Sequence, residues 1–198
     1  MITKKALEME LEKVAEVKGS LGIKYEQYVT PSNIAADVLW RAFLNGDIDG
    51  KVVADLGCGS GRFSYGVELL GGRGVCIEID PSLLSISPAL ERIRAYVPLV
   101  PIRKVDTVVM NPPFGTKVRK ADRPFWEVAL SISNSIYSLQ PLSRDLFKVI
   151  ENRAGKRGFK CNVLATYQFP IKMTYEFHKS KVRRVETALY HCRKVQIW

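Results

Sequence analysis

The sequence contains only two histidines among its 198 residues, and its four cysteines form no closely spaced pair. His178 and His191 do not have the spacing of metal ligands, so we expect no metal site. The cysteines are dispersed through apolar or glycine-rich stretches, which is typical of reduced, mostly buried thiols in a cytoplasmic protein. They are Cys58, Cys76, Cys161 and Cys192.

No apolar segment of the sequence is long enough to span a membrane, and the charged beginning Met1–Lys5 lacks the apolar core of a signal peptide. Internal repeats and low-complexity tracts are also absent. Hydrophobic residues make up 46% of the chain, enough to bury one substantial core. We therefore expect one cytoplasmic domain over residues 1–198, with an N-terminal helical arm over residues 1–24.

Acidic residues are scarce in the second half of the chain. Residues 101–198 carry 19 lysines and arginines against 7 acids, whereas residues 1–100 carry 11 against 13. The net charge of +10 therefore comes from the second half. This asymmetry favours a polyanionic partner on one side of the fold, and nucleic acid is the obvious candidate. A basic solvated surface is the alternative, because it would give the same isoelectric point.

Two helices are expected before the first strand. Apolar residues recur at helical spacing over residues 6–17, and again over residues 32–43. Thr30 has the chemistry of an N-cap for the second helix, with Pro31 at its first position, where a missing N–H group costs nothing. On spacing alone, Gln27 and Tyr28 are ordinary loop residues.

A glycine-rich turn, Gly57-Cys-Gly-Ser-Gly61, follows the short apolar run Val52–Leu56 and precedes a helical pattern over residues 62–70. Strand, glycine turn and helix form the first unit of a nucleoside-binding α/β fold, in which the backbone and the helix N-terminus approach the ligand. Asp55 lies just before the turn. Its charge would repel a pyrophosphate but would suit the amino group of a methionine, which favours S-adenosylmethionine over a dinucleotide.

A second apolar strand, Val75–Asp80, follows this unit and ends in acids. Glu78 lies 23 residues after Asp55, near the spacing at which a carboxylate binds ribose hydroxyls in such folds. A solvated acid at a strand end is the simpler alternative. The pattern then predicts a helix over residues 81–96 and a third strand over residues 97–102, which its two prolines would place at an edge.

A fourth strand, over residues 107–110, ends at the turn formed by Asn111, Pro112, Pro113 and Phe114, because prolines cannot donate a ladder hydrogen bond. Open α/β sheets bind ligands at this end of their strands. The Asn111 side-chain oxygen and the Pro112 carbonyl can each accept a hydrogen bond from an exocyclic amine, and Phe114 can stack on the base. A proline-terminated strand with a packing phenylalanine is the structural alternative.

Basic residues gather in two later segments. A loop over residues 115–124 is one, and the other is Tyr175–Arg184, which lies between strands expected over residues 161–169 and 185–197. Aromatic rings interleaved with basic residues can bind single-stranded nucleic acid by stacking and phosphate attraction. A solvated hairpin is the alternative. The candidate RNA contacts are Lys117, Arg119, Lys120, Lys179, Lys181, Arg183 and Arg184.

Five motifs and one single residue, spread over almost the whole chain, match one known family. The motifs are Glu26-Gln-Tyr28, Val53-Ala-Asp-Leu-Gly-Cys-Gly-Ser-Gly61, Asp106-Thr-Val-Val-Met-Asn-Pro-Pro-Phe-Gly-Thr-Lys117, Tyr137-Ser-Leu139 and Tyr175-Glu-Phe-His-Lys179, and the residue is Thr30. The glycine and proline motifs resemble class I methyltransferases that act on amino nitrogens. The combination is similar to the ribosomal RNA N6-adenosine methyltransferases of the methyltransferase-like protein five family, including its archaeal relatives.

The resemblance implies a Rossmann-like class I methyltransferase fold, with a mainly parallel sheet and an antiparallel last strand. It implies methyl transfer from S-adenosylmethionine to N6 of an adenosine in structured RNA, with Asn111–Phe114 as the catalytic turn. A small zinc-ribbon activator protein bound at a sheet edge is a further implied partner. With Asp55 and Gly61 added from the residue pattern, the candidate cofactor contacts are Gln27, Thr30, Asp55, Gly57, Gly59, Gly61 and Glu78.

One departure from the family lies in the segment Ser87–Lys104. Relatives carry an acid after the third strand that contacts the cofactor adenine, whereas this segment offers no acid at that place. Three alternatives stay open. They are a DNA amino-methyltransferase, a glutamine N5-methyltransferase, in which a tyrosine typically replaces Phe114, and a non-catalytic RNA-binding or assembly factor.

Overall fold

The computed structural model describes residues 2–16, 28–114, 120–173 and 181–195. A seven-stranded sheet lies at its centre, in the order β3-β2-β1-β4-β5-β7-β6. The strands are β1 (Val52–Leu56), β2 (Arg73–Glu78), β3 (Glu91–Arg94), β4 (Thr107–Met110), β5 (Ser135–Pro141), β6 (Phe159–Met173) and β7 (Lys181–Lys194). The helices are α1 (Lys4–Glu12), α3 (Ser32–Leu44), α4 (Arg62–Leu69), α5 (Pro81–Ile86), α6 (Arg123–Ile132), α7 (Arg144–Gly155) and the 3-10 helix η1 (Val97–Leu99).

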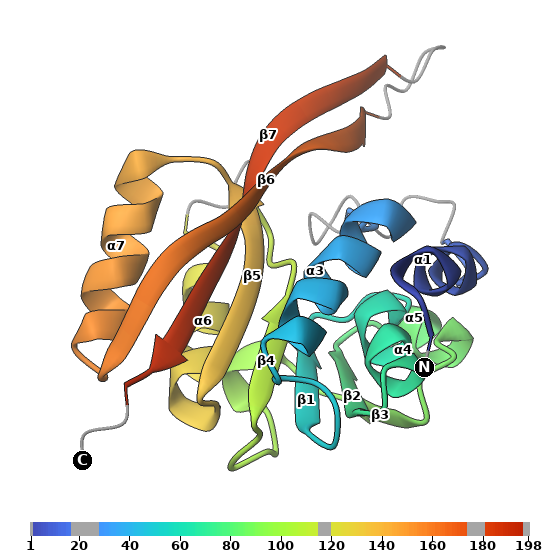
Figure 1. Cartoon of the computed structure of the whole chain (residues 1–198), viewed down its shortest axis with the longest axis horizontal. Helices are drawn as coiled ribbons and strands as arrows, with labels where there is room; N and C mark the ends of the chain where they lie inside the picture. The colour runs from blue at the N-terminus through green and yellow to red at the C-terminus, as the bar shows by residue number, and fades with distance from the viewer. Residues whose placement is uncertain (1, 17–27, 115–119, 174–180, 196–198) are drawn as a thin grey trace.

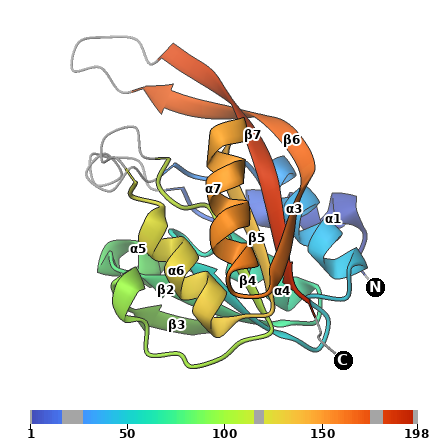
Figure 2. The same cartoon turned by 90° about the vertical axis from the view of Figure 1, so that its left-hand side faces the viewer.

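Five neighbouring strands, β3, β2, β1, β4 and β5, are parallel, and β7 runs antiparallel to both β5 and β6. Helices cover both faces of this sheet (Figures 1 and 2). One apolar core lies between the sheet and α6, α7 and η1, and a second lies between the sheet and α1, α3 and α4. The expected Rossmann-like fold with an antiparallel last strand is confirmed.

The parallel strands bring the predicted site residues to one edge of the sheet. The glycine turn follows β1, Glu78 ends β2 and Asn111 follows β4. The β6–β7 ribbon rises beyond this same edge (Figure 1), since Pro141 at the end of β5 pairs with Thr187 and leaves the first six residues of β7 past it. The site and the basic ribbon therefore share one side of the molecule.

The segment from Pro81 to Ile102 differs from the sequence-based expectation. Helix α5 ends at Ile86, and the third strand is Glu91–Arg94 rather than residues 97–102, which begin with η1. Pro88 explains the early helix end, because the residue before a proline is disfavoured in helical conformation. Ser87 accordingly has an extended backbone, with ψ of 130°.

The N-terminal helix packs on the core, but it is shorter than expected. Leu7 and Leu11 of α1 are fully buried, and Leu11 lies beside Gly66 of α4. Helix α1 ends at Glu12 rather than near residue 17. The arm expected over residues 1–24 extends past residue 16, outside the described residues. Of the helices described, none has the length and apolar character needed to cross a membrane.

Both pairs of cysteines form disulfides, so the expectation of reduced thiols is wrong. Cys161 and Cys192 lie directly opposite each other on β6 and β7, and Cys58 follows β1 beside Cys76 of β2. Neither pairing is visible in the sequence spacing, because the sheet brings together cysteines 18 and 31 residues apart. Burial was expected correctly for Cys58, Cys76 and Cys192.

A buried polar network around Asp47 joins the α3–β1 connection to the sheet at the amino ends of β4 and β5, the ends opposite the predicted site. The Asp47 carboxylate accepts hydrogen bonds from the hydroxyls of Ser135 (2.9 Å) and Tyr137 (2.6 Å), and also from Arg193. The Asp47 backbone carbonyl accepts one from the Thr107 hydroxyl, at 2.8 Å. Strands β4, β5 and β7 are thereby tied to Asp47, β5 and β7 through its carboxylate and β4 through its backbone carbonyl.

His191 stacks on Tyr137 inside this network, with ring centroids 4.5 Å apart, and its Nε2 lies 3.1 Å from the Ser135 hydroxyl. Burial lowers the pKa of His191 to about 4, and the nearby Arg193 charge acts in the same direction against the opposing effect of Asp47. The folded protein therefore favours the neutral ring. His191 contributes stability above pH 6.5, the ordinary pKa, and this contribution is lost as the pH falls towards 4.

The His191→Gln variant is expected to change the pH dependence of stability. Between pH 6.5 and 4, the unfolding free energy of the wild-type protein should fall by about 3 kcal/mol more than that of the variant. Urea unfolding of both proteins at several pH values measures this difference. Comparing the two proteins removes the contribution of other groups, such as Asp55, whose raised pKa acts in the opposite direction. Parallel pH profiles would contradict the prediction.

Candidate active site

The glycine turn has left-handed backbone at three positions, with φ of 71° at Gly57, 55° at Gly59 and 79° at Gly61. Packing requires glycine at Gly61, because an added Cβ would lie 1.9 Å from the Ser87 hydroxyl. An added Cβ at Gly59 would meet nothing within 4 Å. The middle of the turn thus faces open space, as a backbone that admits a ligand must.

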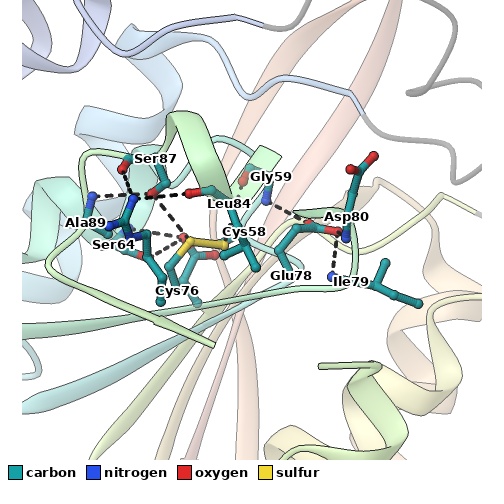
Figure 3. Close-up of a disulfide and its surroundings, with 12 residues drawn as sticks. Cys58, Gly59, Ser64, Cys76, Glu78, Ile79, Asp80, Leu84, Ser87 and Ala89 are labelled. Carbon is teal, nitrogen blue, oxygen red and sulfur yellow. Dashed lines mark hydrogen bonds between the residues drawn. A yellow bond between two sulfur atoms is a disulfide. The ribbon is translucent and has the colours of Figure 1, made fainter. Parts of the chain in front are cut away.

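Glu78 links the end of β2 to this turn (Figure 3). Its carboxylate accepts hydrogen bonds from the backbone N–H groups of Gly59 (3.0 Å), Ile79 (2.8 Å) and Asp80 (3.0 Å). The side chain is buried, and burial raises the pKa of Glu78. The structure therefore holds a carboxylate against the open part of the glycine turn, and its expected role toward ribose hydroxyls stays a prediction.

Asp55 lies beneath the turn and is fully buried. Its Oδ2 accepts hydrogen bonds from the backbone N–H (3.1 Å) and the hydroxyl (2.9 Å) of Ser64 in α4. Burial raises the pKa of Asp55 to about 7, against the effect of these hydrogen bonds. The carboxylate thus joins the end of β1 to the first turns of α4. Its expected role toward a methionine amino group stays a prediction.

The Asn111 carboxamide is oriented by two neighbours. Its Nδ2 donates to the Thr30 hydroxyl at 3.0 Å and to the Tyr28 backbone carbonyl at 3.3 Å. Since a carbonyl can only accept, the nitrogen must face Tyr28, and the oxygen must point the other way. Within the described part of the chain, the buried Asn111 Oδ1 has no hydrogen-bond partner. Such an acceptor is unfavourable by about 1–3 kcal/mol in a protein interior, and a functional role is one common explanation.

Phe114 packs between two aromatic rings. The centroid of its ring lies 5.8 Å from that of Tyr28 and 5.6 Å from that of Phe169, which it meets edge to face. Pro112 is buried, whereas Pro113 and Phe114 are partly exposed. Tyr28 and Phe169 were missed from the sequence as site residues. For Tyr28, its place two residues before Thr30 was the available signal; Phe169 had none.

Thr30 is not the N-cap of α3. The helix begins at Ser32, its N-cap is Pro31, and no side chain caps it. The Thr30 hydroxyl is bonded to Asn111, and its carbonyl accepts a hydrogen bond from the Arg62 guanidinium. Arg62 is 5% exposed and also donates to the Val14 carbonyl at 3.2 Å, so it joins the N-terminal arm to this segment. Burial lowers the pKa of Arg62.

The remaining predicted contacts are only partly described. Lys120 and the ribbon residues Arg183 and Arg184 are exposed, and Lys181 begins β7. The other expected contacts, Gln27, Lys117, Arg119 and Lys179, lie outside the described residues. Within the described ranges, no group of three or more histidine, cysteine or acidic side chains is placed to hold a metal ion.

No model of a protein family matches the chain, but individual known proteins are similar to it. The rRNA N(6)-adenosine-methyltransferase Mettl5 of Drosophila melanogaster is 36% identical, over 83% of this chain and 84% of that protein. An uncharacterized protein of Methanocaldococcus jannaschii is 32% identical, over 98% of this chain and 96% of its own.

Among solved structures, a putative RNA methyltransferase from Pyrococcus horikoshii superposes with a TM-score of 0.87 and 35% identity, covering 99% of this chain and 100% of that one. Its fold and this fold are therefore the same along the full described chain. Together with the sequence relatives, this shows that the chain belongs to the family of rRNA N6-adenosine methyltransferases.

Proposed function

We propose that the protein transfers a methyl group from S-adenosylmethionine to N6 of an adenosine in structured RNA, with small-subunit ribosomal RNA as the substrate. Family membership supports the reaction. The observation that carries the proposal for this chain is the Asn111 Oδ1 at the carboxyl end of β4, which is buried and has no hydrogen-bond partner among the described residues. This oxygen is suited to accept a hydrogen bond from an amino group of a bound base.

The cofactor supplies an electrophilic methyl group, and the catalytic turn must prepare a weak nucleophile. The lone pair of an exocyclic amine is delocalised into the base. Asn111 Oδ1 and the Pro112 carbonyl would each accept a hydrogen bond from the amino group. These two bonds would hold the nitrogen in line with the methyl group that it attacks. Phe114, braced by Tyr28 and Phe169, would stack on the extruded base.

The glycine turn fits the cofactor. Gly59 faces open space, and the Glu78 carboxylate lies against it, where ribose hydroxyls could replace its backbone partners. After β3 the chain continues with Ala95 and Tyr96, so no acid is present there to contact the adenine. The proposed cofactor contacts remain Gln27, Thr30, Asp55, Gly57, Gly59, Gly61 and Glu78.

The β6–β7 ribbon supports an RNA substrate. It rises past the carboxyl edge of the sheet, and Phe169 on β6 contacts Phe114 at its base. Arg183 and Arg184, both exposed, lie in the part of β7 beyond the end of β5. Phosphates bound there would lie on the same side of the molecule as the catalytic turn, so we propose the ribbon as an RNA contact.

The double variant Arg183→Gln, Arg184→Gln is expected to bind RNA about tenfold more weakly, with a smaller salt dependence of affinity. Cofactor affinity should not change. Fluorescence anisotropy with labelled RNA at several salt concentrations measures both effects. The control, Lys156→Gln with Lys160→Gln, removes the same charge from exposed positions near the opposite end of the ribbon, at the end of α7 and the start of β6. Equal losses in the two double variants would contradict a specific role for the ribbon.

A small zinc-ribbon activator protein is a further proposed partner, docked on the β3 edge of the sheet. In the described sheet β3 pairs with β2 alone, and exposed apolar side chains flank it: Leu90 is 84% exposed, Tyr96 59% and Leu99 78%. Such residues are typical of an interaction surface.

Ribosomal RNA as substrate also implies a cytoplasmic location. Disulfides are rare in the cytoplasm of most organisms, but the intracellular proteins of hyperthermophiles are rich in them.

One assay tests the function. The protein is incubated with labelled cofactor and unmodified small-subunit RNA, with and without a zinc-ribbon activator protein, and the labelled nucleoside is identified. Label in N6-methyladenosine supports the proposal. Label in DNA or in protein glutamine would favour the rival amino-methyltransferases. Tight RNA binding without methyl transfer under both conditions would favour a non-catalytic assembly factor.

A further inference from the structure

We propose that the segment Tyr28–Thr30 is a clamp that orients the Asn111 carboxamide, and that the Thr30 hydroxyl is its positioning group. This inference rests on the proposed function. Asn111 can activate an amine only with its oxygen toward the base, but the two orientations of a carboxamide have nearly the same shape. The choice between them therefore depends on the groups around Nδ2.

Both of these groups come from one segment that precedes α3. The Tyr28 carbonyl and the Thr30 hydroxyl accept the two Nδ2 hydrogens, at 3.3 and 3.0 Å. The Thr30 bond is the shorter one, and Thr30 is only 8% exposed, so water cannot easily replace its hydroxyl. The ring of Tyr28 also packs on Phe114. One short segment thus contacts both the amide and the aromatic ring of the catalytic turn.

The Thr30 hydroxyl has no competing role in the helix that follows. Helix α3 has no side-chain cap, although threonine is well suited to provide one. The segment is instead fixed from the other side by Arg62, which donates to the Thr30 carbonyl and to the Val14 carbonyl. Arg62 directly follows Gly61. A series of contacts therefore joins Asn111 to the glycine turn that would hold the cofactor.

Thr30→Val tests the clamp, because valine has the shape of threonine without the hydroxyl. We expect kcat at saturating RNA and cofactor to fall about ten- to hundredfold, since the amide, held by the Tyr28 carbonyl alone, would leave its productive position. Thr30→Ser keeps the hydroxyl and should stay within about threefold of wild type. Comparable melting temperatures for the three proteins would show that the effect is not a loss of folding.

A double-variant cycle separates positioning from structural roles. If Thr30 acts through Asn111, adding Thr30→Val to Asn111→Ala should cause no further loss in single-turnover rate at saturating cofactor and RNA. An unchanged kcat in Thr30→Val, equal losses in the valine and serine variants, or additive losses in the cycle would each overturn the clamp. Wild-type protein that forms no N6-methyladenosine would instead overturn the proposed function.

Discussion

Replacing Asn111 with alanine is expected to lower kcat for methyl transfer by about 100- to 1,000-fold, while the affinities for cofactor and RNA change little. As the amine attacks, its nitrogen becomes positive and its hydrogens become stronger donors. Asn111 Oδ1 and the Pro112 carbonyl therefore interact more strongly with the transition state than with the bound substrate. An interaction of this kind raises kcat rather than binding affinity.

Single-turnover transfer of a labelled methyl group measures the loss, and calorimetry with S-adenosylhomocysteine measures cofactor affinity separately. Asn162→Ala provides the matched control, because it makes the same substitution at an exposed position of β6. The control should retain wild-type kcat. A rate for Asn111→Ala within a few-fold of wild type would contradict the role of the unpartnered oxygen, even if the chain methylates adenosine.

The catalytic turn could be predicted from sequence because its structure is determined locally. Two prolines end β4 immediately after Asn111, whatever the rest of the chain does. The glycine turn is equally local, since left-handed backbone at the alternate positions Gly57, Gly59 and Gly61 favours glycine strongly. Both motifs follow parallel strands, so placing them at one edge required only the α/β fold class.

The groups that orient the turn could not be predicted, because they depend on packing between distant segments. Thr30 reaches Asn111 across 81 residues of sequence, and Arg62 reaches Val14 across 48. Thr30 also has the chemistry of an N-cap, so the local pattern predicts a hydrogen bond to the α3 backbone rather than to Asn111. The position of the third strand has a local cause, because Pro88 ends α5 at Ile86 and the strand then begins at Glu91.

The two disulfides are expected to contribute about 3 kcal/mol each to the unfolding free energy. In the chain-entropy description the contribution grows with the logarithm of loop length, so separations of 18 and 31 residues give similar values. The double variants Cys58→Ala, Cys76→Ala and Cys161→Ala, Cys192→Ala should each lower the melting temperature by about 6–12 °C. Scanning calorimetry measures both shifts.

Only one of these double variants should also weaken cofactor binding. Cys58 lies between Gly57 and Gly59, and Figure 3 shows its disulfide to Cys76 directly beside the residues that hold the turn. Without this disulfide, binding must also restrict a looser turn, and affinity for S-adenosylhomocysteine should fall several-fold. The Cys161–Cys192 disulfide joins β6 to β7 and serves as the matched control for lost stability. Equal cofactor affinities in the two double variants would show that Cys58–Cys76 stabilises the fold without ordering the turn.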